Sequence, residues 1–331
     1  MKKALVTGAA GFIGSNVVRV LLEEGVEVRG MILPGEDQRN LAGLEIEKVE
    51  GDVLNPSSLD RALKDCDTLF HLAAIYQIWL KDRSRFYKVN LQGSRNMLWA
   101  ARRAGVEKVV YTSSIAAIGI KPGGAVSNEE TEFNQYDLAN DYILTKYLSQ
   151  EEALTFAREG LPLVVVNPAF PFGEGDVAPT PTGKLIVDVA NGSNPVFFKG
   201  GMNIVDVKDV ARGHVLAARK GEVGEKYILG NQNYTIKQFF TLVAQLAGVK
   251  PPFLYMPLAV APPVGYLMEK WANYKGQPPL TTSKEIPYAA QYLFFDVTKA
   301  REKLGLVSSP IEESLSRSIE WFRKGGYIKK N

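Results

Sequence analysis

Tyr142 and Lys146 stand four residues apart and form the pair of side chains in this sequence best suited to proton chemistry. On a helix, residues at this spacing share one face. A phenol has a pKa of about 10, and lowering that pKa by about three units takes about 4 kcal/mol. An ammonium about 4 Å away, at an effective dielectric constant of about 20, supplies energy of that order. The pair therefore predicts a tyrosine that is the general acid in carbonyl reduction and the base in the reverse reaction.

The spacing alone is a weak signal, because Tyr266 and Lys270 repeat it by chance among fourteen tyrosines. Context separates the two pairs. A predicted strand that starts at residue 108 ends in the Thr-Ser-Ser run at 112–114, upstream of Tyr142. Doubly wound folds bind ligands at the carboxyl ends of their strands. We therefore expect Tyr142 and Lys146 to be catalytic, and Tyr266 and Lys270 to be packing residues.

Three glycines near the start of the chain predict a phosphate-binding turn. Gly8, Gly11 and Gly14 follow an apolar run at residues 4–6 and precede an amphipathic stretch at 12–22. In such a strand, turn and helix, the glycines let backbone N–H groups approach a pyrophosphate, and the helix N-terminus adds the positive end of its dipole. A turn that merely joins strand to helix is the alternative, but the whole arrangement favours dinucleotide binding.

The elements that position these residues alternate between strand and helix through the first half of the chain. Strands are predicted at 4–6, 26–33, 46–49, 68–72, 108–112 and 161–166, and helices at 12–22, 56–63, 84–104 and 141–159. This pattern predicts an α/β fold with a doubly wound parallel Rossmann sheet. After Pro168, dense prolines and glycines predict a long loop and a smaller, irregular region. We expect a dinucleotide-binding domain over 1–170, rejoined by 204–230, and a substrate-binding region over 171–203 and 231–331.

Composition narrows the class of protein. The 331 residues are 46% hydrophobic and 23% charged, as in ordinary globular proteins. A net charge of +3 with scattered lysines and arginines gives no case for nucleic acid. Cys66 is the only cysteine, so no internal disulfide can form and a cytoplasmic location fits. With His71 and His214 as the only histidines, no metal site is expected, and both are predicted in the core.

No stretch of the sequence approaches membrane-spanning length, so no membrane partner is expected. The most apolar late segment, residues 258–268, contains Pro262 and Pro263. It is predicted as a packed helix that begins at these prolines, with a membrane-surface role as the alternative.

Several motifs together resemble the extended short-chain dehydrogenase/reductase family over nearly the whole chain. They lie at residues 7–14, 51–53, 71–74, 89–93, 111–114, 142–146 and 167–168. Within that family the chain is most similar to bacterial dihydroflavonol-reductase-like proteins, including those named hopanoid-associated sugar epimerases. Residues 179–184 and 227–230 carry this closer similarity.

The resemblance implies a role for each matching position. Ser114 polarises the substrate carbonyl, Tyr142 is the acid or base, and Lys146 is its partner. Tyr142 and Lys146 are also expected to contact the cofactor, with Lys146 hydrogen-bonding the nicotinamide ribose. Asp52 accepts from the adenine amino group, and further cofactor contacts are implied for Phe12, Ile13, Val53, Leu72, Ala73, Ala74, Thr112, Ser113 and Pro168. Asp52 as a simple strand end and residues 73–74 as packing residues are the alternatives. Asn90 is expected to be a structural hydrogen-bonding residue.

The tip of the second strand normally distinguishes NAD from NADP, since an acid there binds the ribose 2′-OH and an arginine accommodates a 2′-phosphate. Leu33 stands where the reductase relatives usually have arginine. Arg39 could fold back onto a phosphate, whereas Glu36 or Asp37 could favour the hydroxyl. Arg39 favours NADP slightly, and NAD is the alternative.

Three reactions of the family compete. No Asp-Glu pair follows Ser114, so dehydration is not expected. Epimerases of nucleotide sugars usually hold the substrate pyrophosphate with arginine, and none stands near residues 204–207. Apolar residues follow the strands instead, at Ile75, Tyr76, Ile78, Trp79, Leu80, Phe170 and Phe172. If they line the pocket, and are not simply packing residues, they favour an apolar or aromatic carbonyl compound.

The sequence therefore predicts NAD(P)H-dependent reduction of a ketone or aldehyde, with Tyr76, Trp79, Ser114 and Phe170 at the substrate. A sugar or nucleotide-sugar epimerase with tightly bound NAD is the first alternative. A non-catalytic NAD(P)-binding regulator is the second. Helices 84–104 and 141–159 form a dimer face in many relatives, so a homodimer is a further expectation.

Overall fold

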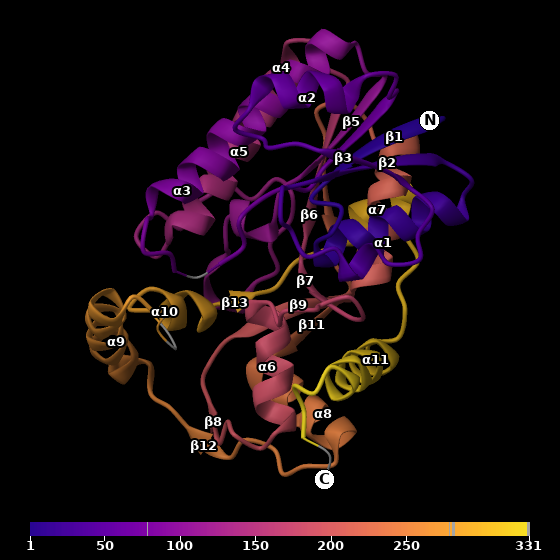
Figure 1. Cartoon of the computed structure of the whole chain (residues 1–331). Helices are drawn as coiled ribbons and strands as arrows, with labels where there is room; N and C mark the ends of the chain where they lie inside the picture. Colours follow the sequence, from indigo (N-terminus) through magenta and orange to yellow (C-terminus); the bar gives the residue numbers. More distant parts are fainter. Residues whose placement is uncertain (78, 278, 280–281, 330–331) are drawn as a thin grey trace.

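The structure is a computed structural model that describes residues 1–77, 79–277, 279 and 282–329. A parallel seven-stranded sheet, in the order β10-β6-β5-β4-β1-β2-β3, forms its centre (Figure 1). The strands are β1 (Lys3–Thr7), β2 (Glu27–Ile32), β3 (Glu47–Glu50), β4 (Thr68–His71), β5 (Lys108–Thr112), β6 (Leu163–Pro168) and β10 (Lys226–Leu229). Most are nearly continuous apolar runs, because helices cover both faces of a parallel sheet. The predicted doubly wound α/β fold is confirmed.

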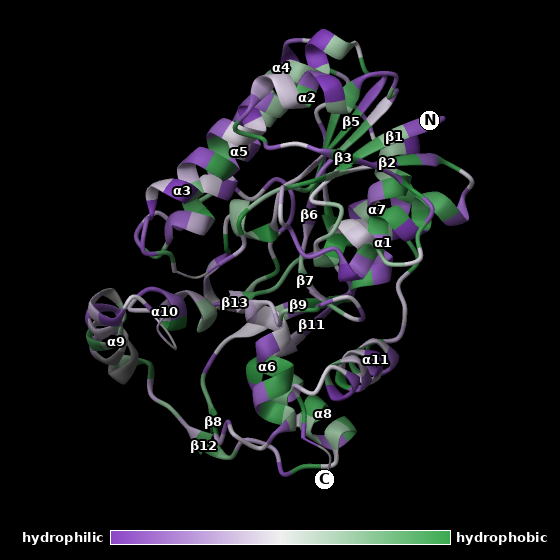
Figure 2. Cartoon of the chain, viewed as in Figure 1, coloured by the Kyte–Doolittle hydropathy of each residue, from purple (hydrophilic) through white to green (hydrophobic). Residues whose placement is uncertain are grey.

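Two layers of helices enclose this sheet. On one face α1 (Phe12–Glu23) packs against α7 (Val207–Lys220). On the other lie α2 (Pro56–Leu63), α4 (Ser94–Ala104) and α5 (Asp141–Arg158). Figure 2 shows the strands between them as largely hydrophobic. A homodimer through the α4 and α5 side stays a prediction.

The predicted long helix over 84–104 is helical throughout but changes its winding. It consists of α3 (Ser84–Phe86), a π-helical segment η2 (Tyr87–Gly93) and α4. The π segment contains Asn90 and Gly93. A Cβ on Gly93 would lie 2.6 Å from Val53, so a glycine is needed for the helix to pack against the turn after β3.

A smaller region lies below the sheet in Figure 1. It is built on a second sheet with strands β7 (Phe170–Phe172), β9 (Gly201–Asp206), β11 (Gln232–Thr235) and β13 (Tyr292–Leu293). Helices α6 (Pro181–Ala190), α8 (Ile236–Ala247) and α11 (Ile311–Lys324) surround a shared apolar core. Phe172 belongs to this core, with its ring centroid 5.1 Å from that of Phe239. Of the two interpretations left open for Phe172, pocket lining and packing, the structure therefore supports packing.

Short elements complete the described chain. Strand β8 (Val196–Phe197) pairs with β12 (Leu254–Tyr255), and α10 (Glu285–Ala289) precedes β13. The remaining turns are η1 (Arg39–Leu41), η3 (Ile115–Ala117), η4 (Pro122–Gly124), η5 (Leu258–Val260) and η6 (Ala300–Leu304). The division into two regions at residue 170 stays a prediction.

The late apolar segment forms η5 and the helix α9 (Ala261–Lys275), which was expected to be packed. Its outer face is instead exposed, and this face includes Tyr266 and Lys270. The Lys270 ammonium lies 5.1 Å from the centroid of the Tyr266 ring, so these two residues form an exposed cation–π pair and the packing prediction is wrong. Among the helices of the described residues, none combines the length and the apolar character needed to cross a bilayer.

Candidate active site

Helix α5 carries both residues of the predicted catalytic pair. The Asn140 side chain caps the helix by accepting the N–H of Ile143 at 2.9 Å, so the first turn is fixed. One turn later, Lys146 is buried and its Nζ donates to the carbonyl of Thr112 at 3.0 Å. Burial lowers the pKa of Lys146 to about 8, since a charged group loses its hydration there.

The Tyr142 phenol lies beside the end of β5. Burial raises its pKa to about 12, and an interaction with the Ser114 hydroxyl partly opposes that rise. The sequence suggested that Lys146 lowers the pKa of this phenol. In the structure the ammonium is bonded to Thr112 at the end of β5, and burial dominates the pKa of Tyr142. Tyr142 is therefore fully protonated at neutral pH.

The serines after β5 are held at the carboxyl edge of the sheet. Ser114 caps the short helix η3, with its Oγ accepting the N–H of Ala116 at 3.1 Å. That bond uses an oxygen lone pair and leaves the hydroxyl proton available. Asn167, on β6, donates to the Ser114 carbonyl at 2.8 Å and fixes its position. The buried Ser113 Oγ has no hydrogen-bond partner within the described part of the chain.

Aromatic rings border the Tyr142 phenol. The ring centroid of Tyr76 lies 5.0 Å from that of Tyr142, at an interplanar angle of 52°. Tyr288, on α10, packs against the same small apolar cluster as Tyr142. Loss of hydration raises the pKa of the Tyr288 phenol and of the Tyr76 phenol, although Tyr76 keeps 38% of its surface exposed, so both phenols are neutral at physiological pH. Trp79 and Phe170 are half-buried, and their predicted contact with substrate stays a prediction, while Ile78 lies outside the described residues.

Tyr288 and Thr182 are site neighbours that the sequence analysis missed. Thr182, in the first turn of α6, interacts with the Tyr76 hydroxyl and lowers its pKa against the effect of burial. Tyr288 stands 146 positions after Tyr142, and no local pattern connects the two. The only sequence signal for Thr182 is the motif at residues 179–184, which carries the similarity to the dihydroflavonol-reductase-like subgroup.

The glycine turn is as compact as the sequence suggested. Gly8 has a φ of +65°, a conformation that favours glycine. A Cβ on Gly14 would lie 2.0 Å from the Gly8 carbonyl oxygen, so the start of α1 packs too closely against Gly8 for any residue but glycine. Thr7 Oγ1 accepts the N–H groups of Leu72 and Ala73, both at 3.1 Å, and so ties the end of β4 to the glycine turn.

This turn forms a cradle that suits a pyrophosphate. Gly11 is exposed at the start of α1, ahead of Phe12 and Ile13, and the first helical turn carries no acidic residue. The helix dipole is therefore available to an anion. Besides the N-terminus of α1, the Ser113 hydroxyl is available to a ligand, because it has no hydrogen-bond partner among the described residues. The side chains present thus fit a dinucleotide lying from the glycine turn toward Tyr142.

The positions implied for the adenosine half are less distinctive. One oxygen of the Asp52 carboxylate accepts the N–H of Leu54 at 2.9 Å, and Val53 is buried against Gly93. The Arg39 guanidinium is exposed and bonds Asp37 at 2.6 Å. These contacts leave the roles of Asp52 and Arg39 as predictions.

Asn90 connects three elements around the site. Its Oδ1 accepts the N–H of Ile75 at 2.7 Å, and its Nδ2 donates to the carbonyl of Ile75 at 3.1 Å. Its amide also bonds the Thr145 hydroxyl on α5 at 3.3 Å. The structural role expected for Asn90 is confirmed, and it fixes the segment after β4 that carries Ala73, Ala74 and Tyr76.

Both histidines are buried structural residues, as predicted. His214 Nδ1 donates to the Val210 carbonyl at 2.8 Å, so its Nε2 accepts from the Thr112 hydroxyl at 3.0 Å. The pKa values of His71 and His214 fall to about 3 and about 4 because burial disfavours the charged ring. No group of three or more metal-ligating side chains occurs among the residues that the structure describes.

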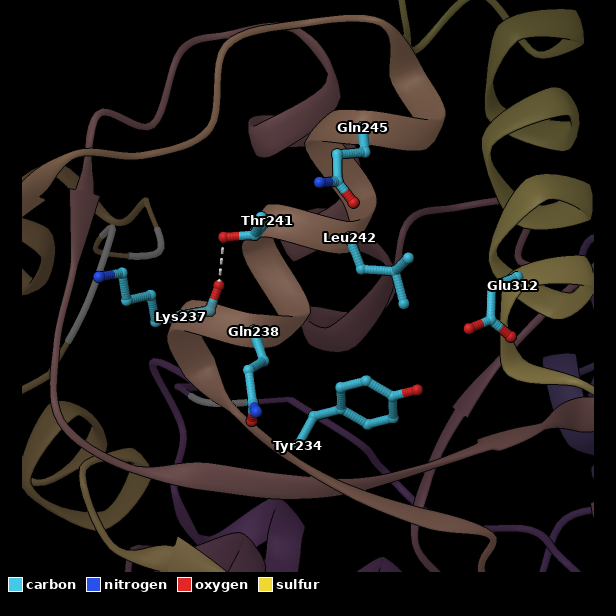
Figure 3. A pocket seen from close by; sticks show the side chains of 7 residues that line it. All are labelled: Tyr234, Lys237, Gln238, Thr241, Leu242, Gln245 and Glu312. Carbon is cyan, nitrogen blue, oxygen red and sulfur yellow. Dashed lines mark hydrogen bonds between the residues drawn. The ribbon is translucent and has the colours of Figure 1, made fainter.

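A surface hollow of about 350 Å³ lies elsewhere, on the outside of α8 and α11 (Figure 3). Its lining is Tyr234, Lys237, Gln238, Thr241, Leu242, Gln245 and Glu312. None of these residues belongs to the predicted site.

Comparison with known proteins fits this geometry. The family model described as NAD dependent epimerase/dehydratase family matches residues 4–230. The chain belongs to this family. A Synechocystis protein named provisionally as a dihydroflavonol 4-reductase is 38% identical over 98% of this chain and 95% of its own length. Sterol demethylase protein B of Methylococcus capsulatus is 34% identical over 98% of this chain and 99% of its own.

Solved structures agree on the fold. A nucleoside-diphosphate-sugar epimerase from Pseudomonas aeruginosa superposes with a TM-score of 0.83 and 27% identity, covering 99% of both chains. Together with the family match, these relatives make this member of the epimerase/dehydratase family an NAD(P)-dependent oxidoreductase of the extended short-chain dehydrogenase/reductase type.

Proposed function

We propose that this family member reduces an apolar or aromatic ketone or aldehyde to an alcohol and prefers NADPH. The observation that carries the proposal is the group of neutral aromatic side chains around the Tyr142 phenol. A wall made by Tyr76 and Tyr288 offers ring faces and no charge to a substrate. Sterol demethylase protein B, by its name, acts on a sterol, and that relative supports an apolar substrate here.

The chain's own groups supply the proton chemistry. A dinucleotide held at the glycine turn of Gly8, Gly11 and Gly14 would supply the hydride for the carbonyl carbon. The Ser114 hydroxyl donates a hydrogen bond to the carbonyl oxygen, and Tyr142 transfers its phenolic proton to that oxygen as negative charge develops there. One C–H bond and one O–H bond form, and the carbonyl becomes an alcohol. The Lys146 ammonium, with a pKa of about 8, then stabilises the phenolate that Tyr142 becomes.

The arginines of the C-terminal half argue against a nucleotide-sugar substrate. Five arginines follow Phe170 in the sequence. Each is bonded to another part of the protein: Arg212 to Asp209, Arg219 to Glu24, Arg301 to Asn231, Arg317 to Asp206 and Arg323 to the Ala247 carbonyl. A substrate pyrophosphate would compete with these partners for a guanidinium.

Epimerisation of a sugar or nucleotide sugar, with tightly held NAD, is a second candidate. The likeness to the Pseudomonas aeruginosa nucleoside-diphosphate-sugar epimerase favours it. A regulator that binds NAD(P) without turnover is disfavoured, because Ser114, Tyr142 and Lys146 are all present.

A screen of NADPH and NADH oxidation with aromatic and aliphatic carbonyl compounds tests the proposal. Tyr142→Phe should lose at least about 100-fold in kcat while keeping its affinity for NADPH, because general acid catalysis is worth about that much or more. Tyr147→Phe is the matched control, since Tyr147 lies on the same helix but stacks on Phe133. Normal turnover by Tyr142→Phe would show that another group is the acid. Conversion of nucleotide sugars with no carbonyl reduction would establish the second candidate.

A further inference from the structure

The outer face of α9 is unusually apolar for a surface helix. Tyr266, Leu267, Trp271 and Tyr274 have 52, 67, 62 and 84% of their surface exposed. The chain leading into the helix is similar, with exposed side chains at Phe253, Leu254, Tyr255 and Leu258. Exposed apolar groups gathered in this way mark an interaction surface.

The inner face of α9 explains why the large side chains point outward. A Cβ on Gly265 would lie 2.5 Å from the backbone of Thr282, so the helix lies directly against the chain before α10. Ala272 is buried on the same side. The Glu269 carboxylate accepts the N–H of Ser283 at 3.3 Å. Small residues and one acid thus anchor the helix, which stands at the edge of the molecule beside α10 (Figure 1).

The charge on this face has one sign. Helix α9 contains two lysines, Lys270 and Lys275, and a single acid, Glu269, which is half-buried on the inner side. The Lys270 ammonium lies 5.1 Å from the Tyr266 ring centroid. The Lys275 ammonium lies 5.9 Å from the rings of both Trp271 and Tyr274. The outer face therefore combines aromatic rings with positive charge and presents no acid from its own segment.

We propose that this face of α9 docks on an anionic lipid surface. Tryptophan and tyrosine combine an apolar ring with a polar group and favour the boundary between membrane and water. Lysine stems bury their methylenes there while the ammonium stays at the headgroups. Cores of protein interfaces are enriched in aromatic residues but depleted in lysine, so the interleaved lysines favour lipid over a second copy of the chain. Helix α9 spans fifteen residues, which is too short to cross a bilayer, so it lies on the bilayer surface. This docking does not depend on the function proposed above.

Flotation of the full chain with lipid vesicles tests the proposal. The chain should bind vesicles of phosphatidylcholine mixed with phosphatidylglycerol, bind vesicles of phosphatidylcholine alone roughly tenfold less, and dissociate as salt is raised. Leu267→Ser/Trp271→Ser/Tyr274→Ser should lose at least roughly tenfold in binding to the anionic vesicles, because it removes the apolar contact. Lys270→Gln/Lys275→Gln should lose roughly tenfold on anionic vesicles alone.

Matched controls carry the same changes on other exposed surfaces. Val223→Ser/Val307→Ser and Lys64→Gln/Lys121→Gln should bind vesicles as the wild type does. An unchanged circular dichroism spectrum and an unchanged melting temperature show that each variant is folded. Equal binding of the wild type to neutral and anionic vesicles, or full binding by the triple serine variant, overturns the proposal. A wild-type dimer that the triple serine variant dissociates also overturns it, since α9 is then an interface between copies.

Discussion

Replacing Lys146 by methionine should stabilise the fold at neutral pH while it impairs catalysis. Burial lowers the pKa of Lys146 to about 8 from an ordinary value of 10.5. At about 1.4 kcal/mol per pKa unit, keeping the ammonium buried at pH 7 costs about 3 kcal/mol relative to the unfolded chain. Methionine keeps the apolar stem but removes the 3.0 Å bond to the Thr112 carbonyl, which offsets about 1–2 kcal/mol. The expected net gain in the free energy of unfolding is about 1–2 kcal/mol.

This gain has a definite pH dependence. Between pH 8 and 10.5 the unfolded state binds the Lys146 proton and the native state has released it. The free energy of unfolding of the wild type therefore rises with pH across this window, while the methionine variant has no corresponding group. The difference between the two proteins should change by about 2.5 kcal/mol between pH 7 and pH 10, in favour of the wild type.

Urea unfolding followed by circular dichroism, at several pH values from 7 to 10, measures this difference. Lys121→Met, at an exposed position, is the control, and its difference from the wild type should stay constant with pH. A constant difference between the wild type and Lys146→Met would refute the burial cost. A Lys146→Met variant that is less stable than the wild type at pH 7 would refute it as well.

Three further outcomes follow from the site. Ser113→Ala removes a buried hydroxyl that has no partner in the described chain, so stability should stay equal or rise by up to about 1 kcal/mol, while calorimetry shows weaker NADPH binding. Arg39→Ala should raise the KM for NADPH about tenfold and leave the KM for NADH unchanged. If the ratio of the two KM values stays as in the wild type, Arg39 only pairs with Asp37. Alcohol oxidation requires the phenolate of Tyr142, whose pKa is about 12, so its rate should rise about tenfold per pH unit from pH 6 to 8. A flat profile would contradict that role.

Local patterns in the sequence were sufficient for the central sheet. Strand β5 and helix α2 begin and end at the predicted residues, Lys108–Thr112 and Pro56–Leu63. The prediction for β6 started two residues early, at 161, whereas the strand spans Leu163–Pro168. Pro162 has no N–H to donate to a ladder, although its carbonyl accepts from Val109 at 2.9 Å. Because buried parallel strands are continuous apolar runs, their first and last residues can be predicted from the sequence to within about two residues.

Long-range placement was not accessible in the same way. Tyr288 joins Tyr142 only because α10 packs beside the start of α5, where Lys284 donates to the Ala139 carbonyl at 2.9 Å. For α9 the apolar composition predicted burial. The inner face is instead formed by Gly265 and Ala272, whose small size lets the helix approach its neighbour closely and leaves the large rings outside.

The two side chains proposed as catalytic, Tyr142 and Lys146, show opposite pKa shifts from one cause. Burial favours the neutral form of each, and so raises the pKa of Tyr142 and lowers that of Lys146. The sequence argument gave the lysine a ground-state effect on the phenol, which the structure does not show. The ammonium instead gains its favourable interaction once the proton has left Tyr142, when a phenolate forms one helical turn away in a buried site. An interaction made only as the reaction proceeds lowers the barrier without tightening substrate binding. The activity lost in Lys146→Met should therefore be a loss in kcat, with the KM of the carbonyl substrate unchanged.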